Sequence, residues 1–161
     1  MKQVVYFLAI TICLSSRSVQ SYKKWELTGY AQGTTYHIKY YATDSIFTQS
    51  QVDSILNSLD SSLSLYKPYS VVNAFNNSLT GIIVDTHLRN VVRKGMEVYD
   101  STEGTFDITV WPLVTAWGFG VKKITEVPDS AAIARLLPCI GTDKLQLSGN
   151  LLKKKLPCVQ L

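Results

Sequence analysis

Apolar residues recur in the first half of the chain at spacings that predict a strand region followed by a helix. Residues 27–42 alternate apolar and polar side chains, which predicts extended structure interrupted at residues 32–35. Thr48 and Gln51 have the spacing of a helix capping box, and the helix that follows is expected to end before Pro68. Its apolar positions are Val52, Ile55, Leu56, Leu59 and Leu63.

A short strand and a second helix are predicted in the middle of the chain. Residues 81–85 contain an Ile-Ile-Val run, and Asp85 or Thr86 is positioned to cap a helix that ends within residues 101–104. The inward face of this helix carries Leu88, Val91, Val92, Met96 and Tyr99.

The last third predicts a short helix and a β-hairpin. Asp129 caps the helix and Pro138 stops it. Gly149–Asn150 lies between two short strand-like runs, which is typical of a hairpin turn. Strands and helices mix without a regular βαβ rhythm, so we expect an α+β fold in which helices pack on a mixed sheet.

Composition is compatible with one folded domain. The chain has 161 residues, of which 46% are hydrophobic and 17% charged, and no apolar run reaches the roughly 18 residues of a membrane span. Nine Lys or Arg balance nine Asp or Glu in residues 1–120, whereas residues 121–161 hold seven against three and supply the whole net charge of +4. This mildly basic end is not a nucleic-acid stripe, so we expect no nucleic-acid partner.

The beginning of the chain has the layout of an export signal. One positive charge precedes an apolar stretch, Val4 to Leu14, which a Ser-rich segment ends. Residues 1–21 are therefore expected to be a signal peptide and residues 22–161 an exported, periplasmic domain; the alternative is a buried N-terminal helix or strand. Cys13 raises a lipoprotein alternative, with a lipid anchor to the inner membrane. It is the second choice, because a bulky residue precedes Cys13.

Two cysteines remain after that cleavage, Cys139 and Cys158. An even count in an exported chain permits a disulfide, and the hairpin between them would bring them close. Two independent buried thiols explain the pattern equally well.

Residues 29–36 form the first of three segments that suggest a binding site. Gly33 would let a ligand approach the backbone closely, and Thr34 and Thr35 add hydroxyl groups that suit a phosphate or a flavin edge. A glycine bulge in a strand is the alternative.

The second segment, residues 65–76, holds Tyr66 close to a proline, where its ring can stack on a planar group. Asn73 and Asn76 can hydrogen-bond ring edges or close the turn locally. The alternative is a loop whose aromatic residues cover the core.

The third segment, residues 104–120, combines Asp107 with Trp111, Trp117 and three glycines. A carboxylate in such apolar surroundings needs a partner or a role. The two tryptophans could wall a flat pocket or form a small aromatic core. No catalytic residue and no metal ligand is assigned, because His37 and His87 are isolated.

Taken together and in this order, the three segments resemble the FAD:protein FMN transferases. Gln32-Gly-Thr-Thr35 is similar to an early Met-Gly-Thr-Thr element of that family. Ser64 to Ser70 and Ala74-Phe-Asn76 are similar to its Ser-x-Tyr-x-Pro-x-Ser and Arg-Phe-Asn elements. Residues 104–120 match its Gly-x-Phe-Asp-x-Thr-Val-x-Pro-Leu-Val-x-x-Trp-Gly-Phe-Gly element almost throughout, which is the most specific part of the resemblance.

The resemblance implies an Mg2+-dependent enzyme. It would cleave FAD, transfer the FMN moiety to a Thr or Ser hydroxyl of an acceptor redox protein, and release AMP. It also implies that Tyr66 stacks on the flavin nucleotide. The cofactor-binding residues implied by the family motifs are Gln32, Gly33, Thr34, Thr35, Tyr66, Thr105, Phe106 and Asp107.

The chain departs from the family pattern in several places. Gln32 stands where Met is usual, Val72-Asn73-Ala74 differs from the usual Glu and Ser-Arg, and Trp111 replaces a common Gly. The acidic segment that would supply the main Mg2+ ligands is expected beyond Leu161.

We therefore expect a truncated flavin transferase, inactive in this form. The alternatives are a short exported flavin-binding or interaction module without catalysis, and an enzyme that hydrolyses FAD.

Overall fold

A long antiparallel hairpin opens the described part of the chain. The structure is a computed structural model that describes residues 20–120 and 126–161, so nearly all of the predicted signal peptide, Cys13 included, lies outside the described residues. Strand β1 (Lys23–Ala31) pairs with β2 (Thr34–Ala42) over nine residue pairs. The interruption predicted at residues 32–35 is the turn of this hairpin.

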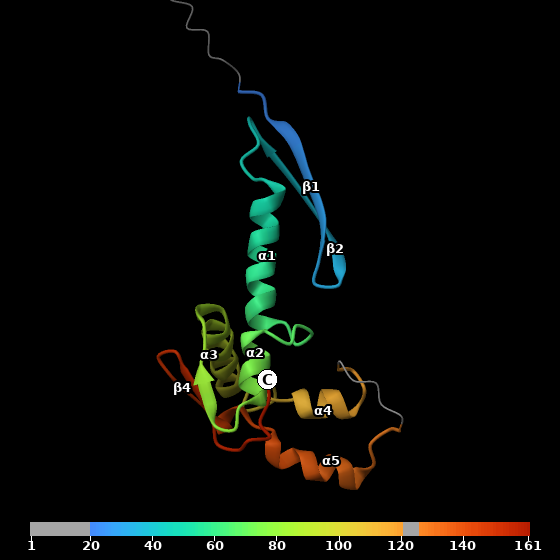
Figure 1. Ribbon diagram of the computed structural model, residues 1–161, viewed down its shortest axis with the longest axis vertical. Helices are drawn as coiled ribbons and strands as arrows, with labels where there is room; N and C mark the ends of the chain where they lie inside the picture. Colours follow the sequence, from blue (N-terminus) through green and yellow to red (C-terminus); the bar gives the residue numbers. More distant parts are fainter. Residues whose placement is uncertain (1–19, 121–125) are drawn as a thin grey trace, which may run out of the picture.

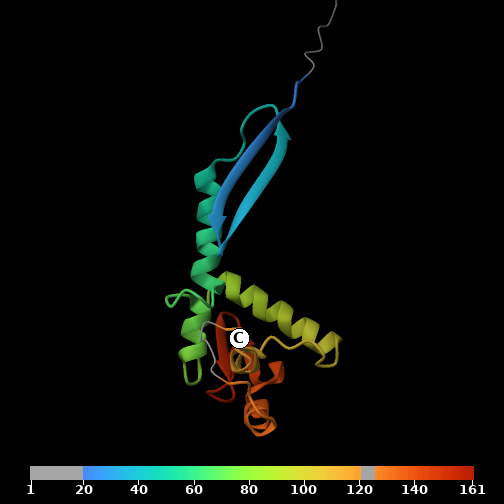
Figure 2. The same ribbon diagram turned by 90° about the vertical axis from the view of Figure 1, so that its right-hand side faces the viewer.

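Helix α1 (Gln49–Leu63) lies alongside the hairpin, and its C-terminal end contacts α2 and α3 (Figures 1 and 2). The predicted capping box is confirmed: the Thr48 hydroxyl accepts from the Gln51 backbone amide, and the Gln51 side chain accepts from the Thr48 amide. The Tyr36 hydroxyl donates to the Asp53 carboxylate at 2.6 Å and links the hairpin to the helix.

Two further helices follow, one of which the sequence pattern did not predict. Helix α2 (Val71–Asn77) begins at Ser70, whose hydroxyl accepts from the backbone amide of Asn73. Helix α3 (Thr86–Ser101) begins at Asp85, which confirms the first of the two caps expected there.

The remaining strands form a three-stranded antiparallel sheet in the order β3-β5-β4. The strands are β3 (Gly81–Ile83), β4 (Leu145–Ser148) and β5 (Leu151–Lys154). The predicted turn at Gly149–Asn150 joins β4 to β5, with Gly149 at a positive φ of 58°. The α+β class is confirmed, although the described strands form two separate antiparallel sheets instead of one mixed sheet.

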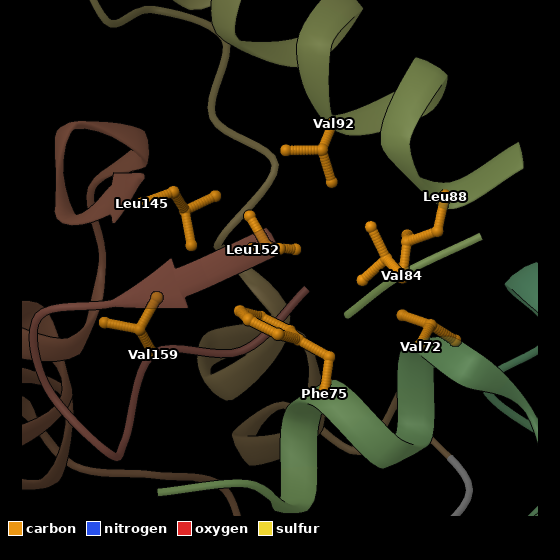
Figure 3. Packing of buried hydrophobic residues seen from close by; sticks show 8 residues of the cluster. All are labelled: Val72, Phe75, Val84, Leu88, Val92, Leu145, Leu152 and Val159. Atoms are coloured by element: carbon orange, nitrogen blue, oxygen red, sulfur yellow. The ribbon is translucent and has the colours of Figure 1, made fainter. Parts of the chain in front are cut away.

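The hydrophobic core lies between this sheet and helices α2 and α3 (Figure 3). Phe75 and Leu152 are fully buried at its centre. The cluster comprises Val72, Phe75, Val84, Leu88, Val92, Leu145, Leu152 and Val159. Residues from both halves of the sequence therefore build one core.

Two short helices and a disulfide complete the chain. They are α4 (Trp111–Ala116), which the sequence pattern did not predict, and α5 (Ser130–Leu136), which begins at the expected Asp129 cap. Single 3-10 turns follow at Leu137–Cys139 and Thr142–Lys144. Cys139 and Cys158 are bonded, with their Cα atoms 5.3 Å apart, so the disulfide alternative is confirmed. Among residues 20–120 and 126–161, the helices are too short or too polar to span a bilayer.

Candidate functional site

A cleft of about 1290 Å³ separates the turn end of the first hairpin from α1. The hairpin contributes Gly29, Tyr30, Ala31, Gln32 and Gly33, and the helix with the turn after it contributes Gln49, Asp53, Leu56, Asn57, Leu59, Asp60, Leu63, Ser64, Leu65, Tyr66 and Lys67. Its volume exceeds the usual range for small-molecule pockets, so it can hold a dinucleotide.

Gln32 and Gly33 reach the cleft because they form a two-residue turn in which both have positive φ, 53° and 80°. Turns of this type match the twist of the strands they join, and Gly is favoured in them. The space beside the Gly33 Cα is open, so a ligand can approach the backbone there as predicted. A glycine bulge, the alternative interpretation, is wrong. Thr34 and Thr35 are exposed on β2 and do not line the cleft.

Polar groups line the wall of the cleft formed by α1. Gln49 and Asp53 form a hydrogen-bonded cluster with the Tyr36 hydroxyl. The hydrogen bond to the Asp53 carboxylate raises the pKa of Tyr36. Asp53 and Asp60 make this wall acidic, and Lys67 supplies the positive charge among the lining residues.

Tyr66 stands between this cleft and a second hollow of about 530 Å³. The second hollow is lined by Leu65, Tyr66, Pro68, Asn73, Asn76, Asn77, Trp111, Thr115 and Gln160. The Tyr66 side chain is 69% exposed, so its ring is available for stacking. Trp111 lines the second hollow, whereas Trp117 does not, so the two tryptophans do not wall one flat pocket.

Asn73 closes the preceding turn locally, whereas the side-chain amide of Asn76 pairs with Leu161, 85 residues away in the sequence. The Nδ2 group of Asn73 donates to three backbone carbonyls of the preceding turn. The side chain of Asn76 accepts from the Leu161 amide at 2.8 Å and donates to the Leu161 carbonyl at 3.0 Å. These two side chains tie α2 to the turn that precedes it and to Leu161.

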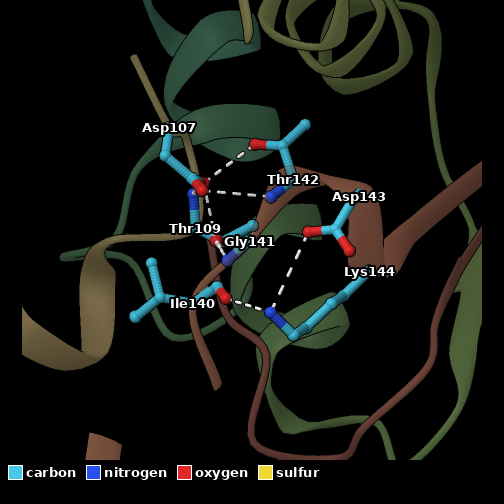
Figure 4. A network of polar contacts seen from close by, with 7 residues as sticks. All are labelled: Asp107, Thr109, Ile140, Gly141, Thr142, Asp143 and Lys144. Atoms are coloured by element: carbon cyan, nitrogen blue, oxygen red, sulfur yellow. Dashed lines mark hydrogen bonds and ion pairs between the residues drawn. The ribbon is translucent and has the colours of Figure 1, made fainter. Parts of the chain in front are cut away.

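Asp107 is the centre of a hydrogen-bond network (Figure 4). Its carboxylate accepts from the backbone amide and hydroxyl of Thr109, both at 2.7 Å, and from the amide and hydroxyl of Thr142 at 3.1 and 2.8 Å. The Thr109 hydroxyl in turn accepts from the Gly141 amide at 2.7 Å. The partner expected for Asp107 is thus a pair of threonines, and the carboxylate holds two distant loops together.

Residues 105–107 do not line the cleft or the second hollow. Thr105 and Phe106 are exposed, and Asp107 is directed into its own network. Contact of Thr34, Thr35 and these three residues with a flavin nucleotide, which the resemblance implies, stays a prediction.

One buried charged residue was missed by the sequence interpretation. Lys154 is only 6% exposed, and its ammonium group donates to the carbonyls of Asn76 and Val159 at 3.1 and 3.0 Å. Burial lowers the pKa of Lys154. Its burial could have been predicted from its position two residues after the buried Leu152, because alternate residues of a strand lie on the same face.

The described ranges 20–120 and 126–161 contain no group of three His, Cys, Asp or Glu residues that could hold a metal ion. The carboxylate oxygens of Asp107 are already occupied by four donors. These residues do not fit the Mg2+ that the resemblance implies.

Comparison with known proteins gives consistent results in sequence and structure. Residues 32–161 match the model of the ApbE family. A FAD:protein FMN transferase of Haemophilus influenzae is 32% identical, over 98% of this chain and 50% of the relative. One from Vibrio cholerae is 33% identical, over 81% of this chain and 41% of the relative.

Solved structures resemble the chain over the same extent. The flavin transferase ApbE from Vibrio cholerae superposes with a TM-score of 0.81 at 30% identity, over 88% of this chain and 48% of that one. The apo flavinyl transferase ApbE of Pseudomonas stutzeri gives a TM-score of 0.79 at 31% identity, over 87% of this chain and 47% of that one. The chain spans about half the length of the curated relatives it matches.

Proposed function

The chain belongs to the ApbE family, and on this premise we propose that it binds FAD in the cleft between the first hairpin and α1, as part of an FMN transferase. One observation carries the proposal. Gln32, Gly33 and Tyr66 come from segments more than 30 residues apart, and the fold brings them to the lining of one cleft. The family motifs, read from the sequence without the fold, had already linked these residues to a flavin nucleotide.

The charges of the cleft suggest how FAD would lie. Asp53 and Asp60 repel phosphate oxygens, so the pyrophosphate binds beside Lys67. The exposed ring of Tyr66, next to Lys67, stacks on a planar ring of the ligand. Gln49 and Asn57 can hydrogen-bond ribose hydroxyls or ring nitrogens along the helix wall.

The chemistry we propose for the complete family fold is transfer of FMN from FAD to a Thr or Ser hydroxyl of an acceptor redox protein. The acceptor oxygen forms a bond to the FMN phosphorus and its hydroxyl proton is released to water, while the P–O bond of the pyrophosphate breaks and AMP leaves with the bridging oxygen. Mg2+ would supply charge neutralisation during this transfer. Because the described residues offer no ligand cluster for it, no step is assigned to the metal in this chain. We further propose that the protein works outside the cytoplasm, as an exported or lipid-anchored periplasmic protein.

Binding and transfer can be measured separately. The chain is titrated with FAD by calorimetry, and is also incubated with FAD, Mg2+ and a Thr-containing acceptor subunit, whose mass is then determined. Saturable FAD binding supports the proposed site, and a covalent FMN adduct on the acceptor extends it to transfer. Absence of saturable FAD binding would overturn the proposal.

A further inference from the structure

Tyr66 is an exposed residue of the turn between α1 and α2. Its ring, like that of Tyr69, is more than two-thirds exposed. The backbone hydrogen bonds of the turn are those from the Lys67 amide to the Ser64 carbonyl, 3.4 Å, and from the Ser70 amide to the Lys67 carbonyl, 3.0 Å. Contacts of the ring therefore do not fix its position, and the position must come from the backbone of the turn.

A single side-chain amide gathers the carbonyl oxygens on both sides of Tyr66. The Nδ2 group of Asn73 donates to the carbonyls of Ser64 at 3.3 Å, Leu65 at 3.0 Å and Lys67 at 2.9 Å. Such an amide has two hydrogens, so one of them is shared between acceptors. Three backbone groups that flank Tyr66 thus converge on one donor.

Asn73 is itself held in place by the helix that carries it. It lies in the first turn of α2, and its backbone amide donates to the Ser70 hydroxyl that caps the helix. Phe75, on the same helix, is fully buried in the core. The Asn73 side chain therefore connects the exposed turn to a helix that packs in the hydrophobic core.

We infer that Asn73 is a positioning residue that holds Tyr66 in its ligand-stacking orientation, at a position where the chain departs from the Ser of the family pattern. The inference rests on the proposed function, because the ligand that stacks on Tyr66 is taken to be FAD. A turn ordered before binding loses less conformational entropy when the ligand arrives, which raises affinity without adding a contact. Asn73 acts through Tyr66 and does not touch the ligand.

The first test measures how readily the hydrogen bonds of the turn open when no ligand is present. Hydrogen exchange of the Lys67 and Ser70 amides is compared in the parent chain and in Asn73→Ala, with Asn90→Ala on α3 as the matched control. Exchange of these two amides is expected to be about tenfold faster in Asn73→Ala, because the loss of hydrogen bonds makes local opening easier. Unchanged exchange, in a variant whose thermal melt shows that it is folded, would overturn the inference.

The second test is a double-mutant cycle with FAD as the ligand. Asn73→Ala is expected to weaken FAD binding about tenfold in the parent chain and to have no effect in a Tyr66→Ala background, since the two residues act as a unit. Asn73→Gln, which keeps the amide, should restore part of the affinity, whereas Asn73→Asp, which lacks the donor, should not. Additive effects in the cycle would overturn the inference.

The two tests separate this inference from the proposed function. If the parent chain binds no FAD but the turn exchanges faster in Asn73→Ala, the positioning of Tyr66 is supported and the proposed function fails. If FAD binds and the turn does not respond, the proposed function stands and the inference fails.

Discussion

Asp107→Asn is expected to destabilise the folded chain even when no ligand is bound. The carboxylate accepts four hydrogen bonds, two from Thr109 and two from Thr142, and the Thr142 pair holds residues 105–109 to residues 141–142. Asparagine has nearly the same shape but only one acceptor oxygen. Its NH2 group would therefore face an N–H or O–H group that now donates a hydrogen bond to a carboxylate oxygen.

The size of the effect follows from the geometry. If the amide oxygen replaces the atom that accepts from Thr109 and the Thr142 hydroxyl, the NH2 group faces the Thr142 amide, now 3.1 Å from Oδ2. An unsatisfied buried donor costs about 1–3 kcal/mol, and three charge-assisted bonds become neutral ones at a further cost of about 1 kcal/mol. The free energy of unfolding should fall by about 2–4 kcal/mol in total.

Urea unfolding followed by far-UV circular dichroism, without flavin, measures this change. Each kcal/mol shifts the melting temperature of a domain of this size by about 4 °C, so a parallel thermal melt should shift down by roughly 8–16 °C. Asp44→Asn, at an exposed position in the loop after β2, is the control and should change little. A loss below about 0.5 kcal/mol for Asp107→Asn, together with weaker FAD binding, would refute the structural role and favour the ligand contact implied by the family motif.

Three further predictions concern the part of the molecule that contains the hydrophobic core. Gly81→Ala should lower the free energy of unfolding by about 2–4 kcal/mol, because a Cβ at its φ of 136° would meet the backbone of the paired strand. Gly149→Ala, where a Cβ would have open space, should lower it by only about 1 kcal/mol. Reducing the disulfide between Cys139 and Cys158, 19 residues apart, should lower the free energy of unfolding by about 3 kcal/mol in a urea melt. Burial lowers the pKa of Lys154 below 10.5. The folded state therefore binds fewer protons at this side chain than the unfolded state does. Raising the pH from 7 toward 10.5 should stabilise the parent chain relative to Lys154→Met.

Each of these predictions has a clear contrary outcome. Equal losses for the two glycine variants would contradict the backbone clash at Gly81. A urea midpoint unaffected by reductant, with free thiols confirmed by titration, would contradict the loop-closure argument. A stability difference between the parent chain and Lys154→Met that is constant over this pH range would show that the buried ammonium does not titrate differently on folding.

Much of the fold was predictable because local signals act over a few residues. The Thr48–Gln51 capping box, the Asp129 cap and the Gly149–Asn150 turn each depend on side chains within four positions of one another, and all three are confirmed. Such signals need no knowledge of the rest of the chain.

The two missed helices are short, and their stability comes from elsewhere. Helix α2 (Val71–Asn77) has seven residues, begins with two β-branched residues and contains three asparagines, so its intrinsic propensity is low. It forms because Phe75 is buried in the core and Ser70 caps it. Helix α4 (Trp111–Ala116) did carry a local signal, a proline in its first turn.

The binding site could be predicted only in part, for the same reason. Family motifs indicated Gln32, Gly33 and Tyr66, but their convergence on one cleft depends on how the hairpin packs against α1. Likewise, nothing local in the sequence shows that Asp107 pairs with Thr142, 35 residues later. Contacts between distant segments are fixed by tertiary packing, which residue spacing does not encode.

The central claim is that Tyr66 forms part of an FAD site in the cleft between the hairpin and α1. Its most direct test is calorimetric titration of the parent chain and of Tyr66→Ala with FAD at constant ionic strength. The account predicts saturable binding by the parent chain and a loss of about 10- to 100-fold in Tyr66→Ala, since a stacked aromatic ring contributes about 1–3 kcal/mol. Equal affinity of the two proteins for FAD, or no saturable binding by the parent chain, would contradict it.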